Sequence, residues 1–209
     1  MGTILVLLGG ALVVYLNWVA LHQRRTPRRA LLRMPATQIA GVKDGAMVRI
    51  AGRAVARGPL RTSPISQRRC VGFRLVVERH DGQVWQKVVD LEELDTFLLS
   101  DDTGDAVLHG PFEINLDPYD ARSADLPPEL FAVLEKEGVP VKGPFGNERQ
   151  FHYVETVLLP GDEITAFGRA TVEIDPAGHA PSPRHPPVMC HLWGRDEAVI
   201  IADADDLAP

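Results

Sequence analysis

Residues 71–89 read VGFRLVVERHDGQVWQKVV, and this stretch indicates a β-hairpin. Its two flanks, residues 71–78 and 84–89, are rich in the β-branched and aromatic side chains that favour strands. Between them lies His80-Asp81-Gly82-Gln83, a polar segment with the glycine that tight hairpin loops use. The pattern therefore predicts two antiparallel strands joined by a short loop.

Strand patterns continue on both sides of this hairpin, and helical patterns are few. One helix is expected where Pro127 and Pro128 open an apolar-periodic segment that Gly138 closes, and a short one over residues 36–42. Further strands are expected at residues 47–55, 97–99, 106–108, 112–116, 154–159, 163–174 and 198–202. Together these elements predict a mainly β (α+β) domain with one or two short helices.

Two of these strands share a pattern. Residues 45–54, GAMVRIAGRA, resemble residues 161–170, GDEITAFGRA, in having a turn glycine, a strand and then Gly-Arg-Ala. A glycine inside a strand marks a bulge or a tight bend. Two such bent strands would suit a small closed or half-closed barrel, and chance similarity is the alternative interpretation.

The N-terminal residues 3–21, TILVLLGGALVVYLNWVAL, contain no Asp, Glu, Lys, Arg or His. A helix needs roughly 20 apolar residues to cross a bilayer, so this run predicts a transmembrane anchor over residues 1–22. A basic juxtamembrane neck over residues 23–35 follows, and its arginines would attract anionic lipids. These are Arg24, Arg25, Arg28, Arg29 and Arg33. A cleaved secretory signal and a buried core helix are the alternatives.

The arginines predict the orientation of the chain, because positively charged flanks stay on the cytoplasmic side. We expect a single-pass protein of a bacterial plasma membrane, with its N-terminus outside. Residues 36–209 would form one cytoplasmic β-rich domain with a proline-rich loop at residues 175–187. Labelling of a cysteine placed in that loop, from outside intact cells, would refute this topology.

Charge and cysteine content narrow the function classes. The formal net charge is -6 although the neck is basic, so the remaining domain is acidic. No basic face for nucleic acid is expected, and no nucleic-acid partner. The two cysteines, Cys70 and Cys190, would stay reduced in the cytosol and are expected to be small buried hydrophobes.

Two constellations invite a chemical interpretation. Asp102-Thr103-Gly104 has the letters of an aspartic protease site, but that chemistry needs a pair of carboxylates, and an Asp-Gly-rich hairpin tip is favoured instead. Four residues invite a zinc hypothesis, but their spacing fits no familiar ligand pattern: His179, His185, Cys190 and His191. Ser63 is interpreted as a turn serine. The remaining histidines are scattered along the chain: His80, His109 and His152. The sequence predicts no catalytic residue, no cofactor and no metal site.

Three segments in order resemble one family. They are PLRTSPIS with CVGFR at residues 59–74, FLLSDDTGDAVL at 97–108, and YVETVLLPGDEITAFG at 153–168. In this order and spacing they resemble the membrane-adjacent domain of RING-type E3 ubiquitin ligases of the GIDE (mulan) type, also called the BAM/GIDE domain, in a prokaryotic RING-less version.

The resemblance implies partner recognition or regulation beside the membrane. Ligase activity should not transfer, because a RING needs around eight Cys and His ligands and this chain has two cysteines. The leading hypothesis is a membrane-tethered interaction or sensing module without catalysis, with membrane lipids and an unknown protein as partners. A ligase by family resemblance and an oligomerising membrane scaffold are the alternatives.

Overall fold

A computed structural model describes residues 34–118, 126–143, 149–174, 188–194 and 198–203. The predicted anchor, most of the predicted neck with its five arginines, and the proline-rich loop lie outside the described residues. Among the described residues, no helix is both long and apolar enough to cross a membrane. Residues 36–209 form one compact unit.

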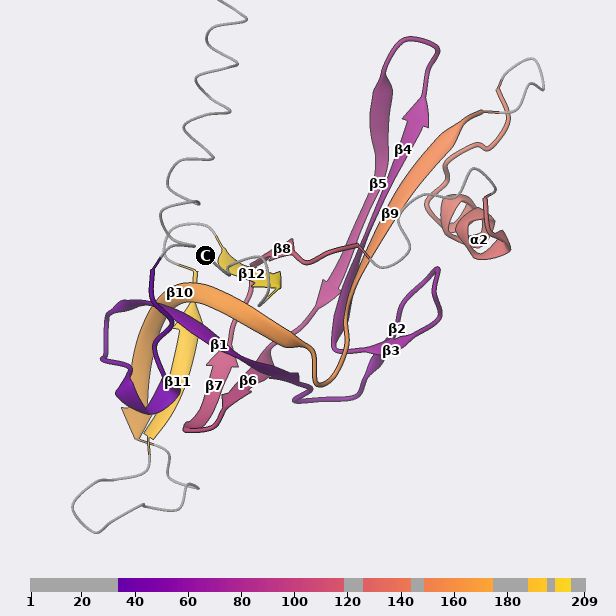
Figure 1. Cartoon of the computed structure of the whole chain (residues 1–209). Helices are drawn as coiled ribbons and strands as arrows, with labels where there is room; N and C mark the ends of the chain where they lie inside the picture. The colour runs from indigo at the N-terminus through magenta and orange to yellow at the C-terminus, as the bar shows by residue number, and fades with distance from the viewer. Residues whose placement is uncertain (1–33, 119–125, 144–148, 175–187, 195–197, 204–209) are drawn as a thin grey trace, which may run out of the picture. The chain divides into compact units, whose positions relative to one another are not determined.

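A closed five-stranded barrel is the centre of this unit (Figure 1). The strands follow one another around the barrel in the order β1-β6-β7-β11-β10, and β10 pairs again with β1. The β7–β11 pair is parallel, and the other pairs are antiparallel. This order is that of the OB-fold, a five-stranded Greek-key barrel. The strands are β1 (Met47–Val55), β6 (Phe97–Asp101), β7 (Gly104–Leu108), β10 (Glu163–Ile174) and β11 (Val188–Trp193).

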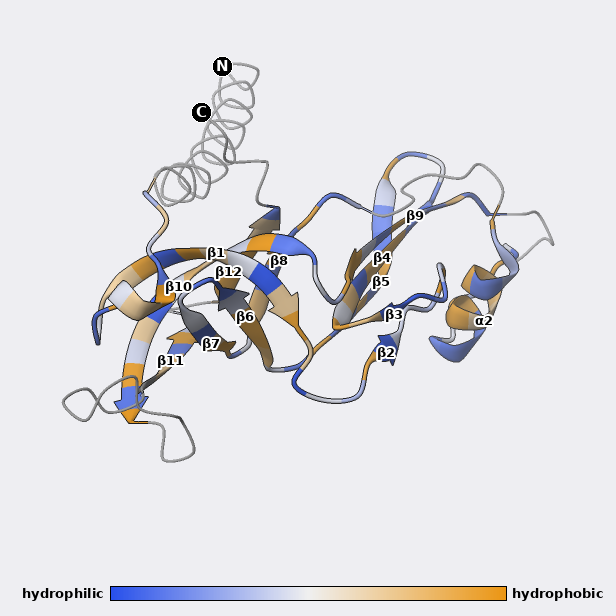
Figure 2. Ribbon diagram, turned by 60° about the horizontal axis from the view of Figure 1, so that its bottom comes forward, coloured by the Kyte–Doolittle hydropathy of each residue, from blue (hydrophilic) through white to orange (hydrophobic). Residues whose placement is uncertain are grey.

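Side chains from every second position of the barrel strands fill the interior, because successive residues of a strand point to opposite faces. Hydrophobic and hydrophilic residues accordingly alternate along β1 and β10 (Figure 2). The fully buried interior residues include Ile50, Leu99, Leu108, Ile164 and Leu192. The sequence prediction of a β-rich, barrel-like domain is confirmed.

Two short strands extend the parallel pair beyond the barrel. The segment β8 (Phe112–Asn115) follows β7, and β12 (Val199–Asp203) follows β11. They pair in parallel with each other, and β12 also pairs with β10.

A second, three-stranded sheet has the order β5-β4-β9, and we call it the arm. It consists of β4 (Gly72–His80), β5 (Trp85–Leu94) and β9 (Phe151–Leu158). The hairpin predicted at residues 71–89 is therefore confirmed and forms two of its strands. The arm strands run side by side away from the barrel in both views (Figures 1 and 2). The arm hairpin is inserted between the first two barrel strands, β1 and β6.

Helix α2 (Pro128–Lys136) covers one face of the arm with Leu130 and Leu134, which pack in one cluster with Leu75, Val77 and Tyr153. This helix is the one predicted from the Pro-Pro start, and Gly138 follows it with a left-handed φ of 68°. The predicted helix over residues 36–42 is only a three-residue 3-10 turn, η1 (Ile39–Gly41). The short paired strands β2 (Arg61–Thr62) and β3 (Arg69–Cys70) lead into the arm.

The two similar strands pair with each other around a local two-fold axis. Ile50 pairs with Ala166, its own counterpart in the sequence echo, in the antiparallel register of β1 and β10. The turn hydrogen bonds repeat as well: Gly45 N–H donates to the Ala170 carbonyl at 2.9 Å, and Gly161 N–H to the Ala54 carbonyl at 2.8 Å. The sequence echo therefore corresponds to a repeated structural element.

The glycines of the two Gly-Arg-Ala segments allow neighbouring strands to approach closely. A Cβ atom on Gly52 would lie 2.5 Å from the Ser100 carbonyl oxygen, and one on Gly168 would lie 2.6 Å from the Trp193 carbonyl oxygen. Neither glycine has the positive φ that is found at Gly45 and Gly161. The close approach of a neighbouring strand's backbone, and not a left-handed φ, therefore explains these glycines.

The Asp-Gly-rich hairpin tip between β6 and β7 is organised by Asp101 and not by Asp102. The Asp101 carboxylate accepts hydrogen bonds from Thr103 N–H at 2.6 Å and Gly104 N–H at 3.0 Å, and its other oxygen accepts from Ile39 N–H at 2.8 Å. Asp102 is exposed. The expectation of a turn is confirmed, but the side chain that caps it is the preceding one.

We expect Asp101→Asn to destabilise the domain by about 1–2 kcal/mol, because its amide group would face the Ile39 N–H donor. Burial raises the pKa of Asp101, but hydrogen bonds from Thr103, Ile39 and Gly104 outweigh it and hold the pKa below its usual value. A depressed native pKa means that this stabilisation is present above the pKa of the unfolded chain and is lost as pH falls through the native pKa. Thermal melts between neutral and acidic pH should show a weaker acid dependence in Asp101→Asn, whereas Asp102→Asn should behave as wild type. Equal behaviour of the two variants would contradict this assignment.

Candidate functional site

His109 and His191 meet on the outer surface of the barrel, although 82 residues separate them. His109 follows the last residue of β7, and its N–H donates to the Leu192 carbonyl at 3.0 Å, continuing the parallel β7–β11 pairing. His109 Nε2 lies 2.9 Å from His191 Nδ1. Both side chains are half-buried.

Trp193 completes this group, which we call the barrel-face cluster (His109, His191 and Trp193). The His109 ring stacks on the Trp193 ring with 3.8 Å between centroids and 4° between planes. Trp193 is 42% exposed. Since residues two apart on a strand share a face, His191 and Trp193 both project outward from β11.

Cys190 projects to the opposite side, into the barrel core. Burial raises the pKa of its thiol to about 11, so it remains a protonated hydrophobe at neutral pH. The hypothesis of a zinc site with adjacent Cys190 and His191 ligands therefore fails on strand alternation. The other two proposed ligands, His179 and His185, lie outside the described residues.

Burial, and then nearby charges, favour the neutral form of His109. Burial, His191 and Arg57 lower the pKa of His109, and Glu173 opposes them with a smaller effect. With an ordinary value near 6.5, the lowered pKa leaves the His109 imidazole unprotonated at neutral pH. His109 therefore contributes a neutral imidazole to the cluster at neutral pH.

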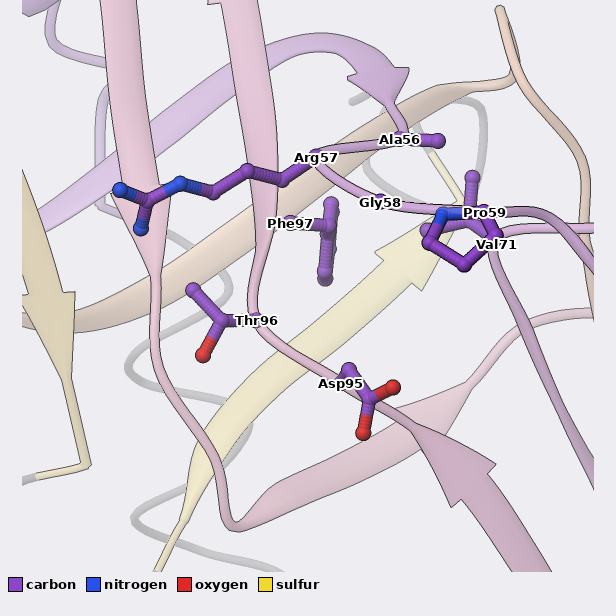
Figure 3. A pocket seen from close by; sticks show the side chains of 8 residues that line it. All are labelled: Ala56, Arg57, Gly58, Pro59, Val71, Asp95, Thr96 and Phe97. Carbon is purple, nitrogen blue, oxygen red and sulfur yellow. The ribbon is translucent and has the colours of Figure 1, made fainter.

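A pocket of about 300 Å³ lies where the barrel meets the base of the arm (Figure 3). Arg57 and Asp95 supply opposite charges, and Thr96 is the residue that precedes β6. Figure 3 shows the Arg57 side chain extending away from Pro59. Such a lining suits a small polar group or a partner's side chain. The remaining lining residues are Ala56, Gly58, Pro59, Val71 and Phe97.

A second aromatic cluster lies near the far end of the arm, and we call it the arm-tip cluster (Trp85, His80, His152 and Glu78). The Trp85 ring lies 5.0 Å from the His80 ring and 5.9 Å from the His152 ring. His152 Nδ1 lies 3.3 Å from Glu78 Oε2. Trp85 is nevertheless 47% exposed, and the neighbouring Val84 is 55% exposed.

Residues 62–66 and 153–155 belong to the segments that carry the family resemblance, and they contact each other through buried side chains. Glu155 is 1% exposed, and its two oxygens accept the N–H groups of Ile65 and Ser66 at 2.8 and 2.9 Å. Ser63 is fully buried and its hydroxyl lies 2.7 Å from that of Ser66, so it is a turn serine as predicted. These motif residues fix the turn against β9.

The thiols are also inert. Cys70 and Cys190 are unpaired and buried, as the sequence predicts. Burial, and then the negative charge of Glu155, raise the pKa of Cys70. A thiol with a raised pKa forms little of the thiolate that reacts as a nucleophile.

Sequence reasoning missed the barrel-face cluster, because no local motif precedes His109 or connects it to His191. Only the parallel register of β7 and β11 places the two together. In the described part of the chain, no group of three or more His, Cys, Asp or Glu side chains is arranged to hold a metal ion. No protein-family model, curated protein or solved structure matches this chain.

Proposed function

We propose that this protein is a membrane-tethered interaction module that binds a protein partner through its arm and carries no catalytic chemistry of its own. The tether is the predicted anchor over residues 1–22, and the cytoplasmic orientation is the one that the arginine-rich neck predicts. The resemblance to the membrane-adjacent domain of GIDE-type ligases supports this proposal, because it implies a role in partner recognition or regulation.

The proposal rests on the surface exposure and the ring contacts of Trp85. A tryptophan that is half-exposed yet held between two histidine rings loses little conformational entropy when it is covered. Tryptophan is also enriched among the residues that dominate binding energy in interfaces. The β4–β5 hairpin that carries it is an insertion between two barrel strands, so barrel closure does not require it.

The experiment places a photoreactive amino acid at the exposed Gln86, next to Trp85, in the full chain in its native membrane. We expect a discrete adduct with a partner protein. Trp85→Ala should reduce this adduct by about thirtyfold, the equivalent of an interface residue worth about 2 kcal/mol.

Helix α2 provides the matched control. Phe131 is 41% exposed there, close to the exposure of Trp85, so Phe131→Ala should leave the Gln86 adduct unchanged. Survival of the adduct in Trp85→Ala would refute the arm as the binding element, as would an equal yield from a probe at the exposed Glu135. An adduct between two copies of this chain would favour the oligomerising scaffold instead.

A further inference from the structure

We propose that the free edge of β5 is a strand-addition site, on which an extended, basic segment of a partner protein pairs in antiparallel as a fourth strand of the arm. This inference rests on the proposed function and deepens it, because it names the binding mode and the chemistry of the partner. Trp85 is the first residue of β5, so the added strand would lie along the strand that carries the proposed binding residue.

The strand β5 lies at an accessible edge of the arm. The strand order is β5-β4-β9, so β5 pairs with β4 on one side and, among the described residues, with no strand on the other (Figure 1). Asp90 and Glu92 are exposed on this strand, whereas β9 at the opposite edge is mostly buried. An exposed edge strand presents backbone N–H and C=O groups that can pair with another chain.

The register of the arm identifies which backbone groups face this edge. His80 N–H donates to the Gln150 carbonyl at 3.0 Å, and hydrogen-bonded pairs alternate with non-hydrogen-bonded pairs in antiparallel strands. The even-numbered residues of β4 therefore direct their backbone groups to β9. Asp90 and Glu92 lie opposite two of these even-numbered residues in the β4–β5 register. Their own N–H and C=O groups consequently point away from β4, toward the free edge.

Glu92 determines the charge that the added strand should carry. The Arg74 guanidinium donates two hydrogen bonds to Asp90, at 3.0 and 3.1 Å, but its Nε lies 3.9 Å from Glu92 Oε2. The Glu92 side chain is only 33% exposed, and burial raises the pKa of its carboxyl group. A lysine or arginine directly opposite Glu92 would have its Cβ about 5 Å away and would supply a closer counter-charge.

The two faces of β5 predict the side-chain pattern of the added strand. Asp90 and Glu92 are exposed on the face away from helix α2, whereas Val89 and Leu91 pack in the cluster beneath that helix. Directly opposite residues of a sheet share a face, so two basic residues, two positions apart, would meet Asp90 and Glu92. The apolar residue between them would lie beside Leu91. A second copy of β5 would bring like charges to this edge, because residues 90–93 hold three carboxylates and no basic residue.

The test uses a synthetic peptide, Thr-Val-Lys-Val-Lys-Val-Thr-amide, with fluorescein on its N-terminus. It is titrated with the full chain in detergent at neutral pH, and binding is followed by fluorescence anisotropy. We expect saturable binding, and no binding when glutamates replace the two lysines. The same peptide with N-methyl groups on both lysine amides keeps its charge but loses two backbone donors, so it should bind at least about tenfold more weakly. Glu92→Gln should weaken binding of the parent peptide about twofold to fivefold.

Asp90→Pro and Asp90→Ala are the matched pair in the protein. Both remove the carboxylate, but only proline also removes the N–H group that faces the free edge, a position where strands tolerate proline. Asp90→Pro should bind the parent peptide at least about fivefold more weakly than Asp90→Ala. Equal affinities of the parent and N-methylated peptides for the wild-type chain would overturn strand addition, as would the absence of saturable binding. This comparison needs no variant, so it remains decisive if proline destabilises the arm.

The Gln86 photo-adduct separates this inference from the proposed function. If the adduct forms and depends on Trp85, but Asp90→Pro reduces it no more than Asp90→Ala, the partner docks without adding a strand and only the present inference fails. If the peptide results are as expected but no adduct forms in the native membrane, strand addition at β5 is supported and the proposed function fails.

Discussion

Gly168→Val is expected to destabilise the domain by about 2–3 kcal/mol, the upper range for a side chain forced into a packed site. The added Cβ would lie 2.6 Å from the Trp193 carbonyl oxygen and 3.0 Å from Leu192 Cγ. The carbonyl belongs to the β10–β11 pair, so relief requires these two barrel strands to separate. Gly52→Val should cost a similar amount, because its Cβ would lie 2.5 Å from the Ser100 carbonyl oxygen.

Thermal and urea unfolding of the full chain measure this effect, and Gly58→Val is the control. A Cβ on Gly58 would meet no atom within 4 Å, and its φ is not positive. Valine there should change stability by less than about 0.5 kcal/mol. Since valine is favoured in an unobstructed strand, a Gly168→Val protein that melts at or above the wild-type temperature would show that the two strands do not approach as described.

Glu155→Ala is expected to cost about 2–5 kcal/mol, because it leaves two buried N–H donors, those of Ile65 and Ser66, without their acceptors. The side chain is 1% exposed, so water cannot readily replace it. Glu155→Gln keeps the shape and one acceptor oxygen but turns its amide group toward the other donor. Glu155→Gln should therefore lower the free energy of unfolding by about 1–3 kcal/mol.

Glu163→Ala is the matched control for Glu155. Glu163 is paired with Arg53 at 3.2 Å, but both side chains are about two-thirds exposed, at 67% and 69%. Removing such a surface pair should cost at most about 0.5 kcal/mol. If chemical unfolding gave the same stability for Glu155→Ala and Glu163→Ala, the buried carboxylate would not be holding the turn against the arm. The sequence motifs at residues 62–66 and 153–155 would then need another structural explanation.

Local patterns in the chain were enough to predict individual strands and helices. β-Branched runs on either side of a glycine-containing loop predicted the arm hairpin, and the Pro-Pro start with Gly138 predicted α2. The repeated Gly-Arg-Ala segments identified the two strands that turned out to pair with each other. These signals are readable because propensity, turn chemistry and side-chain period act over a few neighbouring residues.

Contacts between distant residues depend on strand pairing and on packing in the core. The closure of β10 on β1 and the parallel β7–β11 register brought His109 to His191, and strand alternation turned Cys190 inward, away from its neighbour. At the hairpin tip, the Asp101 carboxylate that caps the turn also accepts the Ile39 N–H of the distant η1. Register and closure are set by the fit of whole faces in one core, and a shift by one residue would exchange the inner and outer side chains of every strand involved.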